Sequence, residues 1–277
     1  MAVPLIRALQ SLPHVSIVDV LVGDLPDDFG AWHVLSKVVC GQGKIYVREA
    51  LERDYDVAVM AIPYDGRWWN GVHFRAKTVM DGRPRPDPTT MGFSSWKKHE
   101  VEYQMENARS LGFEGNTPSC QFLPYSAPVP KSFYVGVGYK KDRAGFWKVK
   151  HWGNENYAKL IKILLERHPD ATVHVTGDLP DFALSIAPIA KLVSNQRLVC
   201  SNTNIEESFS IVSSCTTYIG NDTGMMHVAA ACDRRVVGLF FMENAATKNH
   251  PWCSDWTIFD GSVDREKITP ELVAERL

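Results

Sequence analysis

The chain has 277 residues, of which 45% are hydrophobic and 22% are charged, and its formal net charge is −2. This length suits one large or two ordinary domains, the composition is that of a globular protein, and the small net charge argues against nucleic acid as the main partner. No apolar run approaches the length that spans a bilayer, and Arg7 and Gln10 interrupt the first apolar segment, so we expect a cytoplasmic protein without a signal peptide.

The sequence contains no pattern that predicts a metal site. The six cysteines are scattered without a Cys-x-x-Cys pair, and several lie inside apolar runs, which favours reduced core thiols. The segment "DYD" (54–56) has the spacing of a metal-binding Asp-x-Asp, but it leads directly into an apolar run. We therefore interpret it as the entrance of a strand.

The first half of the chain predicts an α/β domain. Its expected elements are a helix at 3–12, strands at 15–23 and 56–63, a helix at 45–53, and a long charged helix at 96–112 that ends at Gly112. The tryptophan-containing loop 63–75 is interpreted as ordinary packing, with contact with a membrane surface as the alternative. A Pro- and Ser-rich stretch, 115–132, is typical of a linker, and we place the domain boundary between residues 128 and 129.

The second half alternates strands and helices regularly. Strands are expected at 133–138, 171–176, 197–200, 216–219 and 235–241, and helices at 154–168, 181–192, 205–214 and 224–232. Asn204 and Glu207 form a capping-box pattern at the start of the helix 205–214. Such alternation predicts right-handed βαβ units and a parallel sheet covered on both faces. Two doubly wound domains of this kind place a ligand cleft between the carboxyl ends of their sheets.

The segment "YIGNDTGMMHVAAA" (218–231) joins a predicted strand to a helix through a polar turn. The free N–H groups and the dipole of a helix N-terminus suit a phosphate, and Gly224 lets the backbone approach a ligand closely. Thr223 adds a hydroxyl donor, and His227 lies on the first turn of the helix. The Asp222 carboxylate would repel phosphate, so it either caps the helix or accepts hydroxyl groups of a sugar; a plain N-cap is the alternative to a functional role.

A basic loop is expected at the same edge of the sheet. The segment 138–157 carries Lys140, Lys141, Arg143, Lys148 and Lys150, and lysine is suited to a diphosphate. Trp152 offers an aromatic wall, and a solvated charged loop is the alternative interpretation. The third glycine of a dinucleotide fingerprint and a Walker loop are both missing from the sequence. Lysine and the helix dipole, rather than a metal, would then meet the charge of a diphosphate.

These segments resemble glycosyltransferase family 9, the bacterial heptosyltransferases. "NDTGMMHVAAA" (221–231) followed by "RRVVGLFF" (234–241) is similar to the signature of the family. "KHWGNENYAKLIKILLE" (150–166) resembles its Lys-x-Trp-Pro segment, with Gly153 in place of the usual proline. Weaker similarities extend over nearly the whole chain, at 4–23, 98–113 and 174–178.

The resemblance implies a GT-B-like fold of two Rossmann-like doubly wound domains facing a cleft. Residues 1–128 would form the acceptor-side domain and residues 129–277 the domain that binds a nucleotide sugar, without metal or cofactor. Carried over, Lys150 would hold the donor phosphate, Asp222, Thr223 and Gly224 would contact the diphosphate and sugar, His227 would support the turn, and Asp178 or Asp181 would bind the ribose. The family begins with a strand and a Gly-Asp loop whose aspartate is thought to be the base; Met1 falls inside that loop, so the first strand is expected to be missing and no catalytic residue is assigned.

The implied function is transfer of a sugar, heptose above all, from an ADP-linked donor to a lipopolysaccharide-type or other glycan or glycolipid acceptor. Such an enzyme of lipopolysaccharide biosynthesis would work in the cytoplasm, with the inner face of the membrane as a place of peripheral contact. The alternative is a non-catalytic protein that binds a nucleotide sugar or glycan and has lost the N-terminal catalytic loop.

Overall fold

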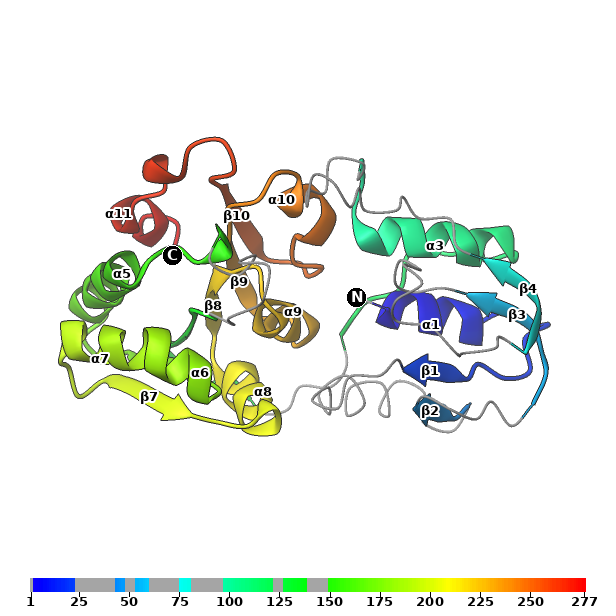
Figure 1. The fold of residues 1–277 in the computed structure, drawn as a ribbon, viewed down its shortest axis with the longest axis horizontal. Helices are drawn as coiled ribbons and strands as arrows, with labels where there is room; N and C mark the ends of the chain where they lie inside the picture. The colour runs from blue at the N-terminus through cyan, green and yellow to red at the C-terminus, as the bar shows by residue number, and fades with distance from the viewer. Residues whose placement is uncertain are drawn as a thin grey trace. The chain divides into compact units, whose positions relative to one another are not determined.

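The computed structural model describes residues 2–22, 43–47, 53–59, 75–80, 97–121, 127–138 and 149–277. The chain divides into two compact units, Met1–Phe122 and Leu123–Leu277. Both are of the α/β type, with parallel strands and helices that pack their apolar faces (Figure 1). The sequence places the boundary a few residues later, within the same Pro- and Ser-rich stretch.

In the part of the N-terminal unit that the structure describes, two pairs of parallel strands accompany two helices that pack against each other. α1 and α3 bury their apolar positions, among them Leu5, Ile6 and Met105, in this contact. α3 begins at a capping box formed by His99 and Glu102, and Gly112, with a φ of +96°, follows its end. The elements are α1 (Val3–Gln10), β1 (Val20–Val22), β2 (Ile45–Val47), β3 (Tyr55–Val59), β4 (Ala76–Met80) and α3 (Glu100–Ser110).

The sequence-based prediction of a helix at 45–53 is wrong at its start. Residues Ile45–Val47 form β2, which pairs in parallel with β1 from Val20↔Ile45 to Val22↔Val47. The run Ile-Tyr-Val is β-branched and aromatic, and pairing with a neighbouring strand outweighs the helical spacing of its apolar residues. β1 is shorter than the strand expected at 15–23, β4 was not predicted, and the end of the strand expected at 56–63 lies outside the described residues.

The segment 54–56 enters a strand, as the sequence predicts. β3 begins at Tyr55, and an aspartate lies on each side of this residue. One aspartate faces a cation of β4, and the other faces the cation just before β4. Asp54 pairs with Arg75 and Asp56 with Lys77, each at 2.7 Å. These exposed pairs link the two strands across the sheet, where opposite charges are favourable.

The C-terminal unit is built on a six-stranded parallel sheet of order β10-β9-β8-β5-β6-β7. α5 and α7 cover one face, and α8 and α9 cover the other (Figure 1). Buried leucines and isoleucines of α5 pack on valines of β5, β6 and β9. The strands are β5 (Ser132–Gly136), β6 (Thr172–Gly177), β7 (Leu198–Asn202), β8 (Thr217–Asn221), β9 (Arg235–Phe240) and β10 (Trp256–Asp260).

The helices expected in this unit are confirmed, with one difference. The helix expected at 181–192 is divided into α6, a π-helical segment at Phe182–Ile186, and α7. The capping box of Asn204 and Glu207 is present. Later elements, which were not predicted, are α10, β10, a 3₁₀ turn and α11. The helices are α5 (Asn154–Arg167), α6 (Leu179–Asp181), α7 (Ala187–Val193), α8 (Ile205–Ser214), α9 (Gly224–Ala231), α10 (Ala245–Asn249) and α11 (Pro270–Ala274).

The order of the strands reverses beside β5. The chain proceeds from β5 to β6 and β7 on one side, and then returns to place β8, β9 and β10 on the other. The connections therefore diverge between β5 and β8, and the carboxyl ends of the strands at such a switch point are where open α/β sheets bind ligands.

Candidate functional site

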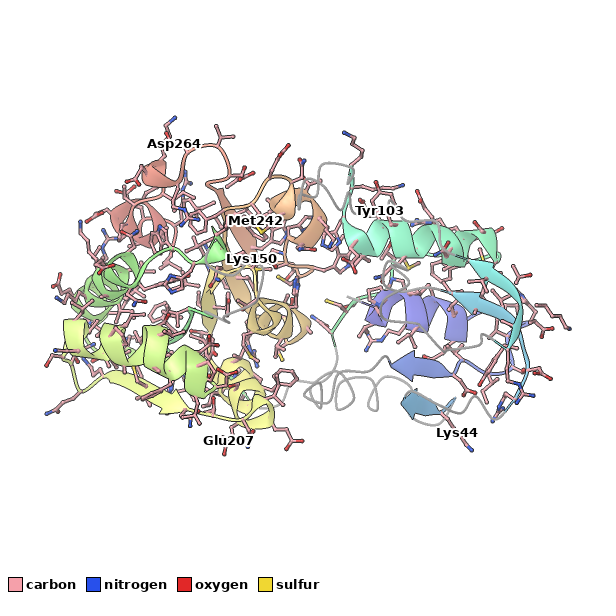
Figure 2. All side chains as sticks on the ribbon, in the orientation of Figure 1. Lys44, Tyr103, Lys150, Glu207, Met242 and Asp264 are labelled. Atoms are coloured by element: carbon pink, nitrogen blue, oxygen red, sulfur yellow. The ribbon has the colours of Figure 1, made fainter. Side chains whose placement is uncertain are left out.

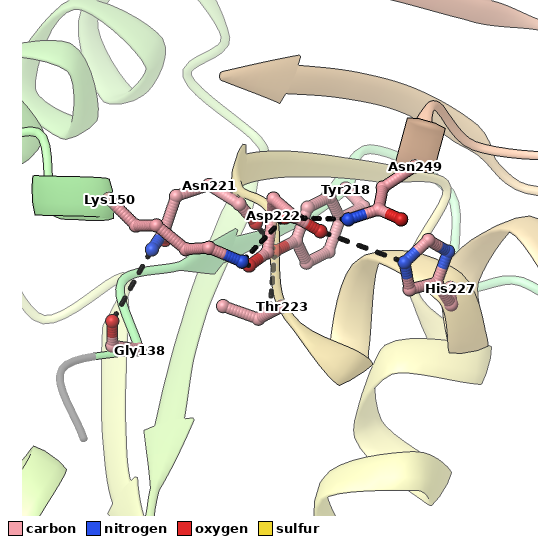
Figure 3. Close-up of polar contacts among 8 residues, drawn as sticks. All are labelled: Gly138, Lys150, Tyr218, Asn221, Asp222, Thr223, His227 and Asn249. Atoms are coloured by element: carbon pink, nitrogen blue, oxygen red, sulfur yellow. Dashed lines mark hydrogen bonds and ion pairs between the residues drawn. The ribbon is translucent and has the colours of Figure 1, made fainter. Parts of the chain in front are cut away.

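The Asp-Thr-Gly turn lies at this topological switch point. β5 and β8 are paired up to Gly136↔Gly220, so the segments that follow them meet at the same edge of the sheet. The Asn221 side-chain amide donates to the Gly138 carbonyl at 3.3 Å, which joins the two segments (Figure 3). A Cβ on Gly138 would lie 2.9 Å from the Thr223 methyl carbon, so glycine permits this close approach.

The centre of the site is the buried carboxylate of Asp222. Its Oδ2 accepts from Lys150 Nζ at 2.6 Å and from Asn249 Nδ2 at 3.3 Å, while His227 Nε2 lies 3.7 Å from its Oδ1 (Figure 3). The side chains of Asp222 and Lys150 are 6% and 14% exposed. A charge at such a depth is stable only when it is paired and hydrogen-bonded, and these donors supply that environment.

The pKa of Asp222 reflects opposing effects. Burial by itself raises the pKa, but the contact with His227 and the positive charge of Lys150 together outweigh it and hold the pKa well below its usual range. The carboxylate is therefore ionised at neutral pH. Lys150 and Asp222 form a neutral ion pair at the edge of the sheet, with His227 beside it.

Helix α9 begins next to this pair with an uncapped first turn. Its N-cap is Thr223, in an extended conformation, and no side chain accepts a hydrogen bond there. The interpretation of Asp222 as an N-cap is thus wrong, because its carboxylate turns to Lys150 instead. A Cβ added to Gly224 would meet no atom of the described residues within 4 Å, so among these residues nothing covers the first turn. An uncapped helix N-terminus facing open space suits an anion.

Buried tyrosines fix the turn from below. The Tyr218 hydroxyl donates to the Asn221 carbonyl at 3.0 Å and contacts Thr223 Oγ1 at 3.1 Å, and the Tyr157 hydroxyl donates to Asn221 Oδ1 at 3.1 Å. Gly136 leaves room for the Tyr218 ring, since a Cβ there would lie 2.1 Å from the hydroxyl oxygen. The Thr223 hydroxyl thus has a partner within the protein.

The sequence suggested that Lys150 belongs to an exposed basic loop, but its side chain is largely buried. It precedes α5, and its side chain lies inside the C-terminal unit, whereas Glu207 and Asp264 project from the edge of that unit (Figure 2). The other basic residues of the expected loop, at positions 140, 141, 143 and 148, lie outside the described residues. What the sequence could not indicate is the contact of Lys150 with a carboxylate 72 positions away.

The residues after Lys150 anchor it. His151 Nδ1 accepts from the Gly153 N–H at 3.1 Å, which leaves the proton on Nε2, 3.0 Å from Ser185 Oγ in the π-helical segment. Burial, with a smaller contribution from the charge of Arg265, lowers the pKa of His151 to about 4. Gly153 has a φ of +107°, which proline cannot adopt.

Trp152 is a core residue rather than the expected aromatic wall. Its side chain is 2% exposed, its Nε1 donates to the Ile268 carbonyl at 3.0 Å, and its ring packs edge-on against Tyr157. Because this indole is part of the hydrophobic core together with Tyr157 and Ile268, it holds the start of α5 in place. The expectation of a ligand contact at Trp152 is wrong.

The acidic pair after β6 caps a helix. Asp178 is exposed, and its Oδ1 accepts from the Asp181 N–H at 3.0 Å at the start of α6. This turn follows β6, the neighbour of β5, so it lies at the same edge of the sheet as Asp222.

Asn249 is the member of the site that the sequence did not reveal. It ends α10, the short helix after β9, and it reaches Asp222 from that side. The available signal was its position just beyond a strand that neighbours β8. Neither α10 nor its contact could be inferred from the sequence pattern.

Comparison with known proteins places this arrangement in context. Residues 142–268, which include Lys150, Asp222, His227 and Asn249, match the family described as Glycosyltransferase family 9 (heptosyltransferase). This chain is heptosyltransferase-like. Lipopolysaccharide heptosyltransferase 2 of Salmonella typhimurium is 34% identical over 101 residues, and lipooligosaccharide heptosyltransferase 2 of Haemophilus influenzae is 31% identical over 101 residues. These matches cover 35% of this chain but only 28% and 29% of the two relatives.

Solved structures extend the likeness to the fold of the whole chain. The structure of Escherichia coli ADP-heptose LPS heptosyltransferase II gives a TM-score of 0.67 at 18% identity, covering 99% of this chain and 92% of that one. Escherichia coli heptosyltransferase WaaC with ADP gives 0.68 at 15% identity, covering 99% and 94%. The fold is therefore GT-B-like.

Two features are absent from the part of the chain that the structure describes. Among the residues that the structure describes, no group of three or more histidine, cysteine, aspartate or glutamate side chains has the arrangement of a metal site. Within the same ranges, no helix has the length and hydropathy needed to cross a membrane.

Proposed function

We propose that the protein is a glycosyltransferase that moves a heptose from an ADP-linked donor to a lipopolysaccharide-type acceptor. The observation that carries this proposal is the Lys150–Asp222 pair beside the uncapped start of α9, inside the segment that matches the heptosyltransferase family. Relatives named lipopolysaccharide heptosyltransferase 2 and a neighbour solved with ADP-2-deoxy-2-fluoro heptose support this choice of acceptor and donor.

In this proposal the C-terminal unit holds the donor. The diphosphate lies over the first turn of α9, where N–H groups and the helix dipole favour negative charge, and Lys150 turns from Asp222 to the phosphate. An acceptor hydroxyl attacks the anomeric carbon and gives its proton to a base, the bond from that carbon to the diphosphate oxygen breaks, and ADP leaves. Lys150 and α9 stabilise the charge that develops on the diphosphate, so the proposal requires no metal or cofactor.

With the diphosphate placed over α9, the ribose and the acceptor can also be assigned to parts of the chain. Asp178 or Asp181 would accept hydroxyl donors of the ribose, and the N-terminal unit would bind the glycan or glycolipid acceptor. The catalytic base is unassigned. We place the reaction in the cytoplasm, at the inner face of the membrane, where a glycolipid acceptor is accessible.

The direct test is release of ADP from ADP-heptose with a lipopolysaccharide-type acceptor present. Wild-type protein should release ADP only when the acceptor is added, and Lys150→Met, which keeps the length of the side chain, should lose this activity. ADP binding by calorimetry without any transfer would instead support the non-catalytic binding protein. A folded wild-type chain that neither binds ADP nor transfers the sugar would overturn both functions.

A further inference from the structure

Asn249 contributes to the site from α10, a helix to which the proposed function assigns no role. Its side chain is 7% exposed, and its Nδ2 donates to the same Asp222 oxygen that accepts from Lys150 (Figure 3). The reversed amide would place its carbonyl oxygen against the carboxylate, so electrostatics fix this orientation. Asn249 is thus a neutral, buried donor to an ionised carboxylate.

The carbonyl oxygen of the same amide is unfavourably placed. Asn249 Oδ1 is buried and has no hydrogen-bond partner among the residues that the structure describes. A buried carbonyl oxygen without a donor lowers stability, and an apolar side chain of similar volume would avoid that penalty. At this position the Nδ2 group of asparagine provides a useful hydrogen bond to Asp222, whereas its Oδ1 atom lowers stability.

The value of this donor becomes clear when Lys150 has a second partner. Lys150 neutralises Asp222 in the absence of a ligand, but a bound diphosphate competes for the same ammonium group. The buried carboxylate then needs donors that do not leave it. His227 faces Oδ1 and Asn249 bonds Oδ2, so each oxygen keeps a partner.

We propose that Asn249 is a positioning residue that holds the Asp222 carboxylate in place while Lys150 binds the diphosphate of the donor. This inference rests on the proposed function. It assigns Asn249 no contact with the ligand, because the residue acts through Asp222. The charged and titratable groups beside it are Asp222, with Lys150 and His227 at the same carboxylate, and its chain neighbours Lys248 and His250.

The test compares three variants by calorimetric titration with ADP and by thermal melting. Asn249→Leu removes the donor and the unpartnered oxygen together. Asn249→Asp places a second carboxyl beside Asp222. Thr247→Ala is the matched control, because Thr247 is exposed on the same helix.

Asn249→Leu should weaken ADP binding about tenfold, the effect of losing a hydrogen bond to a charged group, with a melting temperature equal to or above that of the wild type. Asn249→Asp should weaken binding most at about pH 8, and it should recover relative to wild type towards about pH 5, where the new carboxyl is protonated and donates to Asp222. Thr247→Ala, measured at each pH, should match the wild type, so the difference between Asn249→Asp and wild type at each pH isolates the effect of the new carboxyl.

A structural role would give a different pattern. ADP affinity within about twofold of wild type in Asn249→Leu would overturn the proposal, and so would a loss in Asn249→Asp that is the same at both pH values. If Asn249→Leu does not fold, the pH dependence of Asn249→Asp decides alone. ADP binding that is normal in the wild type but unaffected by these variants refutes only the role of Asn249, whereas no ADP binding by the folded wild type refutes the proposed function as well.

Discussion

Lys150 and Asp222 illustrate how burial changes the meaning of a charged residue. An exposed lysine can be removed with little effect on folding, but Lys150 compensates a carboxylate that is only 6% exposed. We predict that Lys150→Ala lowers the free energy of unfolding by about 3 kcal/mol, because it leaves a buried, unpaired charge. Urea denaturation measures this loss.

The double variant Lys150→Met/Asp222→Asn provides the control for that prediction. It removes both charges while keeping the shapes of the side chains, so it should recover most of the lost stability. ADP binding should stay weak in both variants if Lys150 contacts the phosphate. A double variant as unstable as the single one would show that packing, not charge, makes Lys150 important for folding.

His151 predicts a loss of stability in mild acid. Its pKa is about 4 in the folded protein, against an ordinary value of 6.5, because burial disfavours the charged ring. As the pH falls below 6.5, His151 binds a proton in the unfolded chain but not in the folded protein. The free energy of unfolding therefore declines until the pH reaches about 4. The full contribution is about 3 kcal/mol.

His151→Asn tests this assignment, because its side-chain oxygen can still accept from the Gly153 N–H. We expect the variant to be less stable at neutral pH and to lack most of the decline between pH 6.5 and 4. Denaturation at several pH values provides the comparison. An unchanged pH dependence would mean that other groups, such as His174, whose pKa burial also lowers, dominate the acid response.

Among the elements, α9 can be tested for its role by a contrast between two glycines. A Cβ on Gly224 meets nothing within 4 Å, whereas a Cβ on Gly220 would lie 2.2 Å from the Gly136 carbonyl oxygen in the adjacent strand. Gly224→Val should therefore leave the unfolding free energy within about 1 kcal/mol of wild type but block the approach of a diphosphate. Gly220→Ala should destabilise the sheet, because backbone would have to move.

Calorimetry with ADP separates the functional from the structural role of α9. Gly224→Val with normal ADP affinity would contradict an anion site at the start of this helix. The comparison is informative because the two glycines lie on either side of the same turn, Gly220 near the end of β8 and Gly224 at the start of α9. Only Gly220 is packed against backbone.

The sequence predicted the elements of the C-terminal unit from β5 to β9 well because strand and helix periods alternate there without competing signals, but it did not predict the elements after β9. It predicted the switch-point turn for the same reason. It failed at Ile45–Val47, where pairing with β1 overrides a helical pattern. It also failed at Trp152 and Lys150, since long-range packing decides which side chains are buried. Asn249 was missed because its role depends on a contact between distant segments.

At the scale of the whole molecule, the proposed donor site belongs to a single unit. Lys150, Asp222, His227 and Asn249 all lie in Leu123–Leu277, whose six-stranded sheet has helices on both faces. A domain of about 150 residues buries roughly 70% of the surface of its unfolded chain, which is enough for independent folding. We therefore predict that residues 127–277, expressed alone, unfold cooperatively.

This fragment should bind ADP with an affinity within about threefold of that of the full chain, because the proposed contacts to the diphosphate come from α9 and Lys150. It should not transfer the sugar, since the proposed acceptor site lies in the other unit. Cooperative melting by circular dichroism must be established first, and calorimetry with ADP on both chains then gives the comparison. A folded fragment that binds ADP more than about tenfold more weakly would mean that residues of Met1–Phe122 complete the donor site. Lys150→Met in the fragment is the matched control, and it should reduce ADP affinity by the same factor as in the full chain, because the same ion contact is lost in both.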